Sequence, residues 1–131
     1  MVVRGAPAIG ASAGVGMAIA AQNSTATTVE ALRADLKVAG DVLAKSRPTA
    51  VNLFWAIERM LKLSEKPFDS VEQLKAALLE EAQRIADDDV AINQRMGAFG
   101  AALVPELGLP GAEHRCQLLA CRPHGDPAQL E

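Results

Sequence analysis

The sequence predicts a mainly α protein, and three observations lead to that class. Apolar residues make up 50% of the 131 residues but aromatic residues only 3%, so the core must be aliphatic and alanine-rich, which suits closely packed helices. Several segments repeat apolar residues at helical spacing. Proline or hydroxyl residues precede these segments, at positions that favour helix starts. A chain of this length is expected to form one domain with one core.

The first predicted helix runs from Pro7 to about Gln22. Pro7 suits the first helical position, because the amide that proline lacks has no intrahelical partner there. Small residues occur on every face of this segment, so we expect neighbouring helices to surround it closely. The apolar run over residues 5–21 is short and glycine-rich. It is therefore interpreted as a buried helix rather than a signal peptide or a membrane span.

Two further helices are predicted in the middle of the chain. The second covers residues 29–45, where leucines step at helical spacing after Thr28, a candidate N-cap. The third is expected over residues 48–63, with Pro48 in its first turn. Asn52 lies one turn into it and has two interpretations. It either makes a local cap or a hydrogen bond between helices, or it aligns a ligand or Arg4.

A fourth helix is predicted to begin after Ser70, which together with Gln73 fits a capping box. Its apolar spacing continues to residue 103. The three consecutive carboxylates at residues 87–89 are not expected to hold a metal, because successive helical residues point about 100° apart.

The tail over residues 105–131 has no periodicity and holds four of the seven prolines, so we predict that it is irregular. Both histidines and both cysteines lie there, in the pattern H-x-C-x4-C-x2-H, which is not a usual zinc-binding spacing. No metal site is predicted. Two cysteines do not make a disulfide framework, which favours a reducing, cytoplasmic location. The net charge of −3 and the few aromatic residues exclude a typical nucleic-acid-binding surface.

The start of the chain has the features of an anion site. Gly5 and Ala6 allow a ligand to approach the backbone, and the helix that follows presents free amides and a positive dipole end. Arg4 can bind phosphate oxygens in a bidentate manner. Arg47 followed by Pro48 repeats this pattern. If the two helix starts converge, the site would select a phosphorylated small molecule, although a cap or an ion pair explains either arginine alone equally well.

Two segments resemble a known family. They are Val3-Arg4-Gly5-Ala6-Pro7-Ala8-Ile9-Gly10 and Arg47-Pro48-Thr49-Ala50-Val51-Asn52-Leu53, which are similar to signature segments of S-methyl-5-thioribose-1-phosphate isomerase, of the methionine salvage pathway. A third segment also resembles this family. It begins with Asp89-Val90-Ala91-Ile92-Asn93 and continues to Phe99-Gly100-Ala101. The resemblance covers roughly residues 2–104.

The resemblance implies a helical N-terminal domain over residues 1–104, part of a two-domain isomerase whose Rossmann-like C-terminal domain is absent here. The family converts an aldose 1-phosphate to a ketose 1-phosphate without a metal or organic cofactor, and its full-length members are commonly homodimers. By resemblance, Arg4, Gly5, Ala6 and Arg47 contact the sugar-phosphate substrate. No membrane or nucleic-acid partner is implied.

The chain also departs from this family. The family's catalytic cysteine, in a His-Cys-Asn-x-Gly loop, and its catalytic aspartate have no counterpart, so no catalytic residue is predicted and the fragment is expected to be inactive alone. Residues 123–130 resemble an out-of-frame reading of the family's catalytic loop, and we interpret residues 105–131 as a frameshifted tail. The alternatives are a non-catalytic regulatory or interaction module of the same fold, related to regulatory subunits of a translation-initiation exchange factor, and a helical protein without a ligand.

Overall fold

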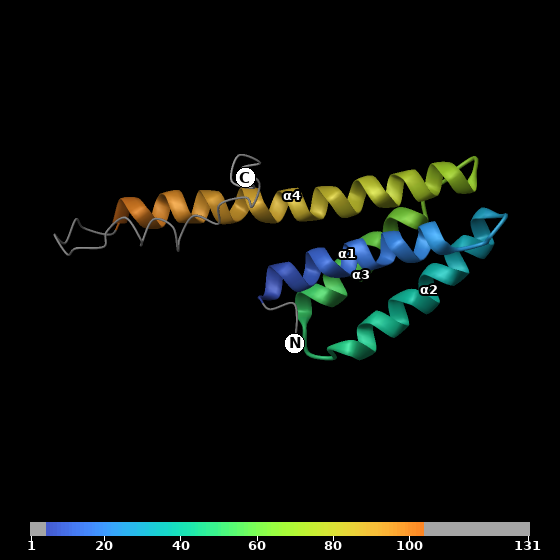
Figure 1. Cartoon of the computed structure of the whole chain (residues 1–131), viewed down its shortest axis with the longest axis horizontal. Helices are drawn as coiled ribbons and strands as arrows, with labels where there is room; N and C mark the ends of the chain where they lie inside the picture. Colours follow the sequence, from blue (N-terminus) through green and yellow to red (C-terminus); the bar gives the residue numbers. More distant parts are fainter. Residues whose placement is uncertain (1–4, 104–131) are drawn as a thin grey trace, which may run out of the picture. The chain divides into compact units, whose positions relative to one another are not determined.

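The structure is a computed structural model that describes residues 5–103, and these residues form four α-helices without a strand (Figure 1). The mainly α prediction is therefore confirmed. The helices are α1 (Ala6–Asn23), α2 (Val29–Ser46), α3 (Val51–Ser64) and α4 (Val71–Leu103).

The chain divides into two compact units, residues 1–89 and residues 90–131, and α4 passes from the first into the second. Two sequence predictions fall outside the described residues: the site residue Arg4 and the irregular tail over residues 105–131. No helix in the described part of the chain combines the length and hydropathy that crossing a bilayer requires.

In the first unit, short connections make consecutive helices run in opposite directions (Figure 1). The N-termini of α1 and α3 therefore lie at one end of this unit, and those of α2 and α4 lie at the other. This alternation decides which helix starts can share a ligand.

The core of the first unit is aliphatic, as the composition predicts. Helix α1 packs against the other three helices through small residues: a Cβ on Gly14 would lie 3.2 Å from Cδ1 of Ile85 in α4, and one on Gly16 would lie 3.4 Å from Leu43 in α2. Val15 and Ile19 of α1 remain 43% and 54% exposed, so the described residues do not cover every face. The largest fully buried side chains are Met17, Leu32, Leu36, Met60, Leu74 and Leu78.

The predicted start of the third helix is wrong. Helix α3 begins at Val51, not at Pro48. Pro48 instead follows Arg47 in a turn that the Ala50 amide closes by donating to the Arg47 carbonyl over 3.1 Å. Proline favours the second position of such a turn and disfavours helical backbone in the residue before it, which is why α2 ends at Ser46.

In the second unit, α4 continues to Leu103, so the predicted helix is confirmed. Its apolar periodicity does not correspond to burial there. The side chains of Ile92, Met96 and Phe99 are 45%, 58% and 74% exposed.

Candidate functional site

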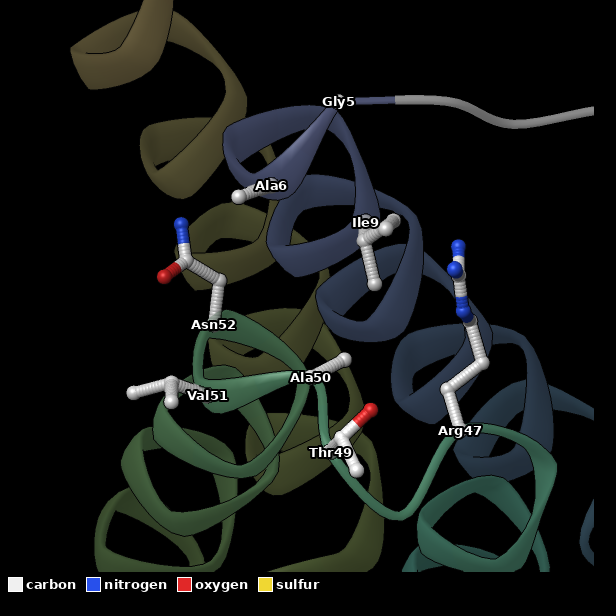
Figure 2. Close-up of a pocket in the computed structure, with 8 residues that line it drawn as sticks. All are labelled: Gly5, Ala6, Ile9, Arg47, Thr49, Ala50, Val51 and Asn52. Atoms are coloured by element: carbon white, nitrogen blue, oxygen red, sulfur yellow. The ribbon is translucent and has the colours of Figure 1, made fainter.

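An open cavity of about 640 Å³ lies where α1 and α3 begin (Figure 2). A volume of this size is typical of sites for small molecules, which span roughly 300–1,000 Å³. The lining residues come from the start of α1, from the turn after α2 and from the first turn of α3. They are Gly5, Ala6, Ile9, Arg47, Thr49, Ala50, Val51 and Asn52.

The start of α1 exposes its backbone to the cavity. Gly5 is the N-cap and has φ +100°, a conformation that residues with a side chain rarely adopt. Its carbonyl accepts the first helical hydrogen bond, from the Ile9 amide at 3.1 Å. No described side chain caps this helix, and no acidic residue lies in its first turn. The positive end of the helix dipole is therefore available to an anion.

The start of α3 has the same character. Its N-cap is Ala50, which has extended backbone and a methyl side chain that cannot accept a hydrogen bond. The Ala50 carbonyl accepts from the Leu53 amide at 2.9 Å. The first turn again contains no acidic residue. A second positive helix end therefore opens onto the same cavity.

Two polar side chains lie on opposite sides of Ala50 in Figure 2, Arg47 at the end of α2 and Asn52 in the first turn of α3. Among the described residues that line the cavity, Arg47 has the only charged side chain. Asn52 packs tightly on α1, because a Cβ on Gly10 would lie 3.1 Å from the Asn52 carbonyl oxygen. This contact holds the two helix starts together.

A second hollow, of about 410 Å³, lies over α3 and the first part of α4 and has a different character. Its central carboxylate, Glu81, is 9% exposed and binds two arginines, Arg59 at 2.5 Å and Arg84 at 2.7 Å. Arg59 also lies 5.3 Å from the centre of the Trp55 ring. Each arginine also has a second carboxylate partner, Asp88 for Arg59 at 3.8 Å and Glu80 for Arg84 at 2.9 Å, so we interpret this hollow as a structural ion-pair network.

Comparison with known proteins identifies the family. Residues 2–116 match the Initiation factor 2 subunit family. The chain belongs to this family. The match includes both segments that line the cavity, at the start of α1 and around the turn after α2.

Individual members of the family are closely similar to the chain. Methylthioribose-1-phosphate isomerase of Syntrophotalea carbinolica is 51% identical over 110 residues, which are 81% of this chain and 31% of that protein. The crystal structure of 5-methylthioribose 1-phosphate isomerase from Pyrococcus horikoshii superposes with a TM-score of 0.73 at 48% identity, over 81% of this chain and 30% of that one. The chain thus spans about 30% of the length of these relatives.

A solved structure with another name is equally similar in fold. Translation initiation factor eIF-2B, subunit delta, from A. fulgidus superposes with a TM-score of 0.72 at 46% identity, over 79% of this chain and 30% of that one. The helical fold of this family is therefore shared by proteins named as enzymes and by proteins named as initiation-factor subunits.

The structure brings together three of the four predicted site residues, since Gly5, Ala6 and Arg47 all line the cavity. The fourth, Arg4, lies outside the described residues. Sequence reasoning did not single out Thr49 as a site residue. Its position between Arg47 and the start of α3 is the signal that could have identified it.

The described part of the cavity has the chemistry of an anion-binding site. Its lining contains a guanidinium and two helix N-termini, which can donate hydrogen bonds to phosphate oxygens, together with an amide and a hydroxyl, which can both donate and accept. None of the described lining residues carries a carboxylate, thiol or imidazole that would transfer a proton near neutral pH. Residues 5–103 also contain no group of three or more His, Cys, Asp or Glu residues arranged to hold a metal ion.

Proposed function

We propose that this chain carries part of the substrate site of a methylthioribose-1-phosphate isomerase, and that the cavity binds the phosphate group of the sugar phosphate. The observation that carries this proposal is the convergence of two uncapped helix N-termini and Arg47 on one cavity. The names of the similar proteins supply the ligand. In this proposal Arg4, Gly5, Ala6 and Arg47 contact substrate.

The chain alone binds the sugar phosphate weakly and does not isomerise it. The reaction is an aldose–ketose conversion, which moves hydrogen between adjacent carbons and needs a positioned acid and base. The described lining residues supply binding groups only. We place the reaction in methionine salvage in the cytoplasm, with a homodimer as the working form of the full-length enzyme. Ketose formation from 5-methylthioribose 1-phosphate by the purified chain would contradict the proposed inactivity.

The central experiment is a titration of the ¹⁵N-labelled chain with inorganic phosphate and with 5-methylthioribose 1-phosphate, followed by NMR. The backbone amide signals of Ala6, Val51 and Asn52 are expected to shift with both probes. Arg47→Ala should weaken the binding of both probes by about tenfold or more, because a charge-assisted hydrogen bond to phosphate is lost.

The matched control for Arg47 is Lys45→Ala. Lys45 is an exposed cation in the last turn of α2, two residues away, and it does not line the cavity. The Lys45→Ala variant should change the affinity for either probe by less than twofold. Equal losses for the two variants would mean that general positive charge, rather than the cavity, attracts the anion.

The second candidate function is a non-catalytic regulatory module, which the similarity to the eIF-2B delta subunit favours. In such a module the same helices would serve contacts with other proteins. The titration separates the two candidates. Failure of the wild-type chain to respond to 5-methylthioribose 1-phosphate would favour the module.

A further inference from the structure

The cavity offers many hydrogen-bond donors but few acceptors. The Arg47 guanidinium and the open amides of α1 and α3 only donate, which suits phosphate oxygens. A sugar also carries hydroxyl groups, which donate as well as accept. Among the described side chains that line the cavity, only the Thr49 hydroxyl and the Asn52 amide can accept from them.

Asn52 is held more firmly than Thr49. It is half-buried, whereas Thr49 is exposed in the turn. Its backbone and Cβ pack against α1, since a Cβ on Gly10 would lie 3.1 Å from the Asn52 carbonyl oxygen and 3.4 Å from its Cβ. Figure 2 shows its amide rising beside Ala6, on the side of Ala50 away from Arg47. The two polar side chains are therefore placed to bind different parts of one ligand.

The amide of Asn52 has no structural task within the described residues. Asparagine is favoured at N-caps and is only a modest helix former, yet the N-cap of α3 is Ala50 and Asn52 lies inside the helix. None of the hydrogen bonds between described side chains and other described groups involves it. The sequence left two interpretations of Asn52 open. The first, a local cap or a hydrogen bond between helices, is not observed among the described residues.

We infer that Asn52 binds the hydroxyl groups of the sugar, while Arg47 and the two helix N-termini bind its phosphate. This inference rests on the proposed function and adds a division of the cavity into a sugar side and a phosphate side. Asn52 is then a specificity-determining residue, which favours a sugar phosphate over a bare phosphate ion. The cavity volume of about 640 Å³ leaves room for both parts of the ligand.

The test is Asn52→Ala in the same two titrations. Alanine keeps the Cβ that packs near Gly10 and is a better helix former, so the fold should be retained. Binding of 5-methylthioribose 1-phosphate should weaken about threefold to tenfold, the effect of losing one or two ordinary hydrogen bonds. Binding of inorganic phosphate should stay within twofold of wild type.

Asn52→Ser is the second variant, because a serine hydroxyl both donates and accepts. It should recover part of the affinity for the sugar phosphate without changing that for phosphate, a pattern that a merely structural role would not produce. Equal weakening of both probes by Asn52→Ala, or no weakening of either, would overturn the inference.

These failures are distinguishable from failure of the proposed function. If Arg47→Ala weakens both probes while Asn52→Ala weakens neither, the phosphate site stands and only the role of Asn52 is wrong. If the wild-type chain binds neither probe, the proposed function fails and the inference fails with it.

Discussion

The two ends of the first unit differ in whether side chains cap the helix N-termini. At the end where α2 and α4 begin, side chains cap both helices: Thr28 Oγ1 accepts from the Ala31 amide and Ser70 Oγ accepts from the Gln73 amide, each at 3.2 Å. At the cavity end, neither α1 nor α3 has a side-chain cap from any described residue. Acidic residues follow the same division, with Glu30 and Glu72 in the first turns of the capped helices only.

The capped end also binds the carbonyl groups that helices leave open at their C-termini. Arg33 of α2 donates to the carbonyl of Ser64, the last residue of α3, at 2.7 Å and to that of Lys66, just after α3, at 2.9 Å. Lys75 of α4 donates to the carbonyl of Ser24 after α1 at 2.8 Å. Cations at helix C-termini also interact favourably with the helix dipole.

The difference separates a structural end from a binding end. Where the chain satisfies its own helix termini, those groups stabilise the fold and are not available to a ligand. Where glycine and alanine occupy the N-caps, the described chain leaves first-turn amides open, at some cost in stability. Such a cost is expected where a ligand provides the missing interactions.

The largest expected effect is on the contact that joins the two open helix starts. Gly10→Val should lower the free energy of unfolding by about 1–3 kcal/mol, because its side chain would meet the backbone carbonyl of Asn52, which cannot move independently of α3. It should also weaken phosphate binding by separating the helix starts. Urea unfolding and the phosphate titration measure the two effects.

The control for this variant is Gly16→Ala on the same helix. A Cβ there would lie 3.4 and 3.6 Å from the methyl carbons of Leu43, an ordinary packing distance, and alanine favours helix. Stability should be unchanged or slightly higher. A loss of unfolding free energy as large as that of Gly10→Val would show that α1 tolerates no added volume anywhere along its length. The sensitivity to added volume would then not be confined to the cavity end.

A cap removed from the structural end should have a smaller effect. Thr28→Ala removes the acceptor for the Ala31 amide and should cost about 1 kcal/mol of unfolding free energy. Phosphate affinity of the folded chain should be unchanged, because Thr28 lies at the end of α2 away from the cavity. A parallel fall in affinity would mean that the two ends are not independent.

The smallest expected change in stability is a gain at the binding end. Ala50→Ser adds a capping hydroxyl to α3 and should raise the unfolding free energy by about 0.5–1 kcal/mol. The same hydroxyl competes for first-turn amides, so phosphate binding should weaken. Ala76→Ser, on an exposed position of α4, adds a hydroxyl away from any helix start and should leave binding unchanged. Tighter phosphate binding by Ala50→Ser would contradict the role given to the open amides.

Local interactions made several elements predictable. Thr28 and Ser70 cap the helices that they were expected to cap, because the capping hydrogen bonds join residues three positions apart. The start of α3 was not predictable in the same way. A proline suits both the first turn of a helix and the second position of a turn, and here the bond from the Ala50 amide to the Arg47 carbonyl selects the turn.

The sequence by itself determined the fold class, most helix bounds and the residue types of an anion site, since each depends on neighbours along the chain. Tertiary structure alone decided that these parts share one cavity. Gly5 and Arg47 are far apart in sequence, and they line one volume because α1 and α3 run in the same direction and pack where Gly10 admits Asn52. That contact depends on the shapes of two distant segments, which no local pattern encodes.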